Sequence, residues 1–148
     1  MKTNTSRILV ALFAFVASSS GRELIELAAE IQAAGPEVRE MPYVNGEKEE
    51  IIKVSKFSIV KTEDVESVSI GGDPLVATVV LSAEGRKKMV KGTTDMKGKR
   101  LAVIINGRIN MLPMLNDAPL GGEFVITGFK DPADAKAFGD KFNKKNEG

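Results

Sequence analysis

Residues 101–115 read LAVIINGRINMLPML and contain the strongest structural signal in the chain. The run Leu101–Ile105 is rich in β-branched residues, which favour strands. Asn106 and Gly107 follow, and this dipeptide tolerates the positive φ angles of a tight two-residue turn. Residues 108–115 can then return as a second strand, so the stretch predicts a β-hairpin.

The segments on either side of this hairpin predict further strands and two helices. Residues 75–81 form a β-branched run, and Ser82 offers a hydroxyl group that can cap the start of a helix directly after it. Residues 123–127 predict another strand, and Asp131 is expected to cap a final helix that begins at Pro132. The predicted buried face of that helix consists of Ala135, Phe138 and Phe142.

The first half of the chain gives weaker signals. Residues 23–32 read ELIELAAEIQ, which fits a helical and a strand period equally well. Residues 35–46 are expected to form a loop, because Gly-Pro and Asn-Gly pairs bound a polar stretch without an apolar stripe. Residues 51–54, 57–60 and 65–70 predict short extended segments.

Together these elements predict an α+β fold. We expect one mixed or antiparallel sheet of about six or seven strands, with two main helices on one side.

The sequence contains neither histidine nor cysteine. Zinc fingers, iron–sulfur sites, thiol nucleophiles, histidine-based triads and disulfides are therefore excluded. A carboxylate mechanism needs two acidic groups brought together in a cleft, and the family resemblance described below implies no such pair. We expect no catalytic residue, no metal site and no cofactor, so the chain is not predicted to be an enzyme.

The net charge of +1 conceals a strong asymmetry. Residues 21–80 carry 6 basic and 12 acidic side chains, whereas residues 81–148 carry 13 basic and 8 acidic ones. Much of the basic excess lies in residues 86–100, where no aromatic residue is interleaved to stack on bases. This pattern favours a solvated helix face over a nucleic-acid site.

The N-terminus has the order of regions found in secretory signals. Lys2 and Arg7 precede an apolar run at residues 8–17, which a small polar stretch follows. The run is too short to span a bilayer, which takes about 20 residues, although a buried N-terminal helix is an alternative. We therefore predict a signal peptide at residues 1–20 and a single exported domain at residues 21–148, periplasmic or secreted and soluble after cleavage.

The order of motifs in residues 75–142 resembles a known family. The motifs are AEGRKKM, GKRLAVIINGRI, a proline at position 113, GGEFVITG and DPADAKAF, in that order. They resemble the head of the first periplasmic domain of SecD, an accessory subunit of the bacterial protein-export channel. The resemblance also favours a strand at residues 23–32.

The resemblance implies a function as well as a fold. In SecD the head is thought to hold emerging polypeptide, so we expect a non-catalytic binding module for extended polypeptide or an envelope protein, with a role as an export accessory. The alternative is a structural or self-assembly module without an export role. The chain has no segment long enough to be a transmembrane helix, and we expect no nucleic-acid partner.

A partner-binding segment is predicted after the second hairpin strand. Proline cannot donate a ladder hydrogen bond, which confines this segment to a sheet edge, a bulge or a strand end. Alternation places residues 112 and 114 on one face, so this face is either a docking site or covered core. The candidate residues are Met111, Leu112, Pro113, Met114 and Leu115, and the motif and turn residues are Gly85, Gly98, Asn106, Gly107, Pro113, Gly121, Gly122, Thr127 and Gly128.

Overall fold

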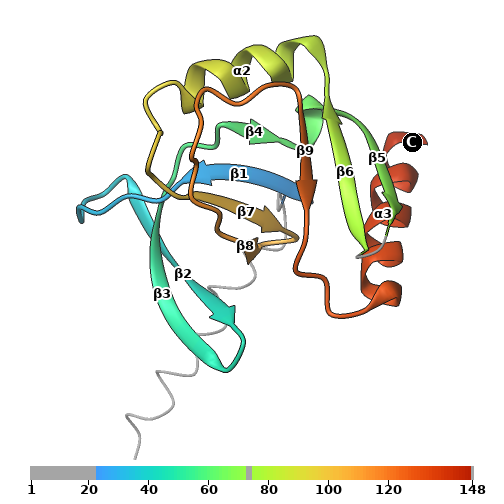
Figure 1. Ribbon diagram of the computed structural model, residues 1–148, viewed down its shortest axis with the longest axis horizontal. Coiled ribbons are helices and arrows are strands. Elements are labelled where there is room, and N and C mark those ends of the chain that lie inside the picture. The colour runs from blue at the N-terminus through green and yellow to red at the C-terminus, as the bar shows by residue number, and fades with distance from the viewer. Residues whose placement is uncertain (1–22, 73–74, 148) are drawn as a thin grey trace, which may run out of the picture.

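The computed structural model describes residues 23–72 and 75–147 of the chain. The predicted signal peptide therefore lies outside the described residues. Nine strands fall within them, arranged in three antiparallel sheets in the orders β4-β1-β7-β8, β2-β3 and β5-β6-β9 (Figure 1). The strands are β1 Ile25–Ala29, β2 Val38–Asn45, β3 Lys48–Ser55, β4 Val60–Lys61, β5 Val65–Gly71, β6 Val76–Leu81, β7 Leu101–Ile105, β8 Arg108–Met111 and β9 Glu123–Ile126.

The described residues also form a short 3-10 helix and two α-helices: η1 Thr62–Asp64, α2 Ala83–Thr93 and α3 Pro132–Glu147. The α2 helix contacts β4 and β6, and α3 packs on β5 and β6 (Figure 1). The predicted α+β class is confirmed, and the strands are distributed over three sheets instead of one. Two of these sheets and both helices enclose the larger of two hydrophobic cores.

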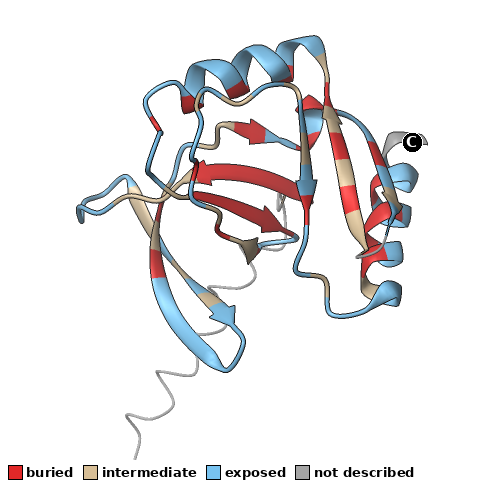
Figure 2. Cartoon of the chain, viewed as in Figure 1, coloured by how far each residue is buried: buried red, intermediate tan, exposed pale blue. Residues whose placement is uncertain are grey.

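The four-stranded sheet is covered on both faces. All five residues of β7 are buried, and alternate residues enter different cores. Val103 packs in the larger core, together with Met89 of α2 and Phe142 of α3. Ile104 packs in the smaller core, against Ile52 of the β2–β3 hairpin. The uninterrupted apolar run of β7 is therefore explained by burial on both sides, and Figure 2 shows β1 and β7 as almost wholly buried.

The β2–β3 hairpin corrects the predicted loop at residues 35–46. Residues 38–45 form a strand that pairs along its whole length with β3. The polar composition of β2 follows from its position, because its inner face meets the smaller core only through the half-buried Met41 and Tyr43. Pro42 is tolerated because β2 has a single strand partner in the described part of the chain.

One ion pair joins the base of this hairpin to β1, and a second joins the segments next to β1 and β7. The Arg39 guanidinium donates to the carboxylate of Glu26, which is buried. Just beyond β1, Arg100 donates to both carboxylate oxygens of Glu30, at 2.8 and 2.6 Å. This hydrogen bonding raises the pKa of Arg100 above its ordinary value. The tip of the hairpin is exposed and extends away from the rest of the fold (Figure 2).

The local signals for turns and helix starts are confirmed. Asn106 and Gly107 have φ angles of 51° and 84°, as the tight turn between β7 and β8 requires. The Ser82 hydroxyl accepts a hydrogen bond from the Gly85 N–H at 3.0 Å and so caps α2. The Asp131 carboxylate accepts from the Asp134 N–H at 2.8 Å at the start of α3.

Candidate functional site

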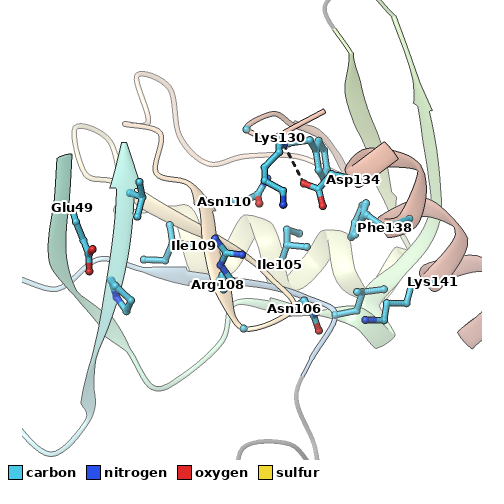
Figure 3. A pocket seen from close by; sticks show the side chains of 17 residues that line it. Glu49, Ile105, Asn106, Arg108, Ile109, Asn110, Lys130, Asp134, Phe138 and Lys141 are labelled. Carbon is cyan, nitrogen blue, oxygen red and sulfur yellow. Dashed lines mark hydrogen bonds between the residues drawn. The ribbon is translucent and has the colours of Figure 1, made fainter. Parts of the chain in front are cut away.

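A pocket of about 610 Å³ opens between the β2–β3 hairpin, the β7–β8 turn and α3. We call it the hairpin pocket (Figure 3). Three segments that are distant in sequence form its walls, and Leu24, just before β1, contributes as well. Its lining residues are Leu24, Pro42, Val44, Glu49, Ile105, Asn106, Gly107, Arg108, Ile109, Asn110, Gly128, Phe129, Lys130, Asp134, Ala137, Phe138 and Lys141.

The floor of the hairpin pocket is apolar, and its rim is polar. Ile105 belongs to the larger core and Ile109 to the smaller one, so the pocket lies where both cores reach the surface. Phe129 and Phe138 extend the floor, with ring centroids 5.6 Å apart. The rim carries exposed polar and charged side chains, among them Asn106 and Arg108. An apolar floor with a few polar groups around it is typical of a ligand site.

Some of the predicted motif residues meet in this pocket. Asn106, Gly107 and Gly128 all line it. Gly128 has a φ angle of +88°, and a Cβ atom there would lie 2.5 Å from the backbone oxygen of Asn110. Only glycine permits this close approach of the segment before α3 to β8. Asn110 strengthens the contact by donating from its side chain to the Thr127 carbonyl oxygen at 2.7 Å.

Most of the other motif glycines permit close packing or a turn away from the pocket. A Cβ atom on Gly85 would overlap the backbone of Asp64, and one on Gly122 would lie 2.7 Å from Nε of Arg86. Gly98 has a φ angle of +81° in the turn before β7. A Cβ atom on Gly121 would have no neighbouring atom within 4 Å, so space alone does not require glycine there.

The predicted partner-binding segment is divided between several environments. β8 ends at Met111, and the following residues continue along the edge of the sheet, where Pro113 O accepts from Leu101 N at 2.9 Å. Leu112 enters the smaller core and Leu115 the larger one. Met114 is 57% exposed, so it does not share the environment of Leu112 as simple alternation predicted. Pro113 lies just after the end of β8, the edge strand of its sheet, and four of the five side chains of the segment are at least partly buried.

The exposure of Met114 leads to a stability prediction. Replacing Met114 with lysine is expected to change the free energy of unfolding by no more than about 0.5 kcal/mol, because a solvated position accepts a charge. Urea denaturation of the wild type and the variant measures this difference. A loss of several kcal/mol would show that the side chain is part of the core.

The hairpin wall of the pocket was missed by sequence reasoning. Pro42, Val44 and Glu49 lie on β2 and β3, within or next to the segment expected to be a loop. The available signal was the spacing of Met41, Tyr43 and the apolar residues of β3 across Asn45-Gly46, which is a hairpin pattern. Lys130 and Lys141 belong to no sequence motif, so the sequence alone did not assign them to a site.

Residues 23–72 and 75–147 contain no group of three or more acidic, histidine or cysteine side chains placed to hold a metal ion. Within the same residues, no helix has the length and hydropathy needed to cross a bilayer.

Comparison with known proteins places this geometry in a family. The model of the SecDF P1 head subdomain matches residues 37–139. SecDF of Thermus thermophilus is 29% identical over 111 residues, which are 66% of this chain and 14% of that protein. SecD of Acidaminococcus fermentans is 24% identical over 112 residues, which are 66% of this chain and 27% of that protein. The chain thus matches only a small part of each of these translocase subunits.

Solved structures agree with this match at the level of the fold. A crystal structure of SecDF in a super-membrane-facing form has a TM-score of 0.63 at 18% identity, covering 82% of this chain and 19% of that one. A second structure, of SecDF described as a membrane component that enhances protein export, has a TM-score of 0.60 at 17% identity. The match covers 88% of this chain and 66% of that chain. Since the family model spans more than half of the sequence, this chain belongs to the SecDF P1 head subdomain family.

Proposed function

We propose that this chain is a non-catalytic exported binding module that holds extended polypeptide in the hairpin pocket. The observation that carries the proposal is the pocket, with a volume of about 610 Å³ and an apolar floor between the β2–β3 hairpin, the β7–β8 turn and α3. Ligand sites in proteins commonly measure about 300–1,000 Å³. The pocket is therefore large enough for several apolar side chains of a bound segment.

The strands beside the pocket favour an extended chain as the ligand. Among the described residues, β2 pairs only with β3, and β8 pairs only with β7. Both strands border the pocket, through Val44 and Ile109 among other residues. A sheet edge has backbone groups that can pair with an added strand, and the main-chain hydrogen bonds do not depend on sequence. Such a site suits polypeptides of varied sequence.

Two features support a location outside the cytoplasmic membrane. The first is the signal peptide predicted at residues 1–20. The second is membership of a family whose matching relatives are protein translocase subunits, which suggests an exported domain. An accessory role in protein export accords with both features.

Site-specific crosslinking in intact cells tests the proposed site. A photoreactive amino acid is placed at Val44, which lines the pocket and is 56% exposed. The matched control is Ile51, on the same hairpin and 58% exposed but outside the pocket. We expect Val44 to give adducts with many unrelated envelope precursors, identified by mass spectrometry, and Ile51 to give few.

Equal labelling from both positions would contradict a binding role for the pocket. Adducts confined to a second copy of this chain would instead support the alternative, a self-assembly module.

A further inference from the structure

Three cations that line the hairpin pocket form no ion pair with any described residue. Arg108 is exposed on β8, Lys130 precedes α3, and Lys141 lies on α3, and all three line the pocket. In the described part of the chain, none of these three side chains is within 4.0 Å of a carboxylate oxygen in an ion pair. Their charges are therefore available to a ligand.

Three cations elsewhere in the described residues pair with buried or nearly buried carboxylates. Arg39 pairs with Glu26, and Arg100 pairs with Glu30. On α2, the Lys88 Nζ atom lies 2.8 Å from a carboxylate oxygen of Asp64, and this hydrogen bond raises the pKa of Lys88. The unpaired cations of the pocket thus differ from those that stabilise the framework.

The two acidic side chains of the pocket do not cancel this charge. Asp134 lies in the first turn of α3, and its carboxylate accepts a hydrogen bond from the Lys130 N–H at 3.1 Å. The helix N-terminus and this bond offset part of its negative charge. Glu49 lies on the hairpin, at the opposite end of the pocket from Lys130 and Lys141 (Figure 3). The end of the pocket next to α3 is therefore positively charged.

We propose that the hairpin pocket selects extended peptide segments in which acidic side chains flank an apolar anchor. The inference rests on the proposed function, because it assigns a substrate class to the same site. The anchor occupies the floor at Ile105 and Phe138, while the flanking carboxylates lie against Arg108, Lys130 and Lys141. Acidic flanks are attracted to these cations, which have no ion-pair partner among the described residues, whereas basic flanks are repelled.

Binding of three synthetic peptides to the full chain tests this selectivity. The peptides have equal length and the same central apolar segment, with Glu, Gln or Lys flanks, and fluorescence anisotropy measures each dissociation constant. At low salt, we expect the Glu-flanked peptide to bind at least about fivefold more tightly than the Lys-flanked one. Each partly exposed ion pair contributes little binding free energy, but the contributions of several pairs add up. The difference should shrink at high salt, where the Debye length falls to about 3 Å.

A charge-reversed variant and a matched control test whether the preference for acidic flanks arises in the hairpin pocket. In the Arg108→Glu, Lys141→Glu double variant, we expect the preference to invert in favour of Lys flanks. The control is Lys99→Glu, Lys145→Glu, which alters the net charge equally at exposed positions outside the pocket. The control should keep the wild-type preference, and thermal melts of both proteins should match the wild type because all four positions are exposed.

The outcomes separate this inference from the proposed function. If all three peptides bind with equal affinity, or if the control variant changes the preference as much as the pocket variant, the charge selectivity is wrong and peptide binding stands. If no peptide binds the wild type, the proposed function fails and the selectivity fails with it.

Discussion

Replacing Gly85 with alanine is expected to lower the free energy of unfolding by about 2–4 kcal/mol. Gly85 lies in the first turn of α2, against the 3-10 helix η1. A Cβ atom there would lie 2.4 Å from the backbone oxygen of Asp64 and 2.9 Å from its Cβ atom. Both distances are far below van der Waals contact, so α2 or η1 must move.

Asp64 cannot move without breaking other contacts. Its carbonyl oxygen accepts a hydrogen bond from the Ser82 N–H at 2.9 Å. Its side chain is buried and accepts from the Lys61 N–H at 3.0 Å and from Lys88 Nζ at 2.8 Å. A displaced Asp64 would leave a buried carboxylate with fewer donors, which is costly. The added methyl group therefore strains a rigid contact.

Urea denaturation of the Gly85→Ala variant measures this loss. Gly121→Ala is the control, because no atom lies within 4 Å of its added Cβ and its φ angle is not positive. We expect the control to remain within about 0.5 kcal/mol of the wild type. Equal stabilities for the two variants would show that α2 is not held against Asp64 by this contact.

The features that the sequence predicts correctly are those in which a few neighbouring residues determine the backbone. The Asn106-Gly107 turn and the Ser82 cap depend on local φ preferences and one short-range hydrogen bond. The buried face of α3 follows from helical spacing, and its three predicted residues are all buried. These features need no knowledge of distant segments.

The remaining features depend on tertiary contacts. β2 is polar and contains Pro42, and it is a strand because β3 supplies its hydrogen bonds and the smaller core covers one face. Residues 112–115 follow the edge of β7 after β8 ends, so simple alternation did not predict their burial. The hairpin pocket combines β2 and β3 with the β7–β8 turn and α3, which no local motif relates to one another.

Truncating Phe142 to alanine is expected to remove about 3–5 kcal/mol of folding free energy, the usual range for a buried phenylalanine. Its side chain is 1% exposed and packs in the larger core beside sheet residues. The loss combines the transfer free energy of the ring with the cavity left under α3. Urea denaturation measures it, with Asn143→Ala as a control at an exposed position of the same helix.

The control should change stability by no more than about 0.5 kcal/mol, in the stabilising direction, because alanine is the better helix former. Truncating Phe142 also bears on the hairpin pocket, because α3 carries Phe138 and Lys141, which line it. If the truncation costs less than about 1 kcal/mol, α3 is not anchored through its apolar face. The pocket wall would then lack the rigid support that a selective binding site requires.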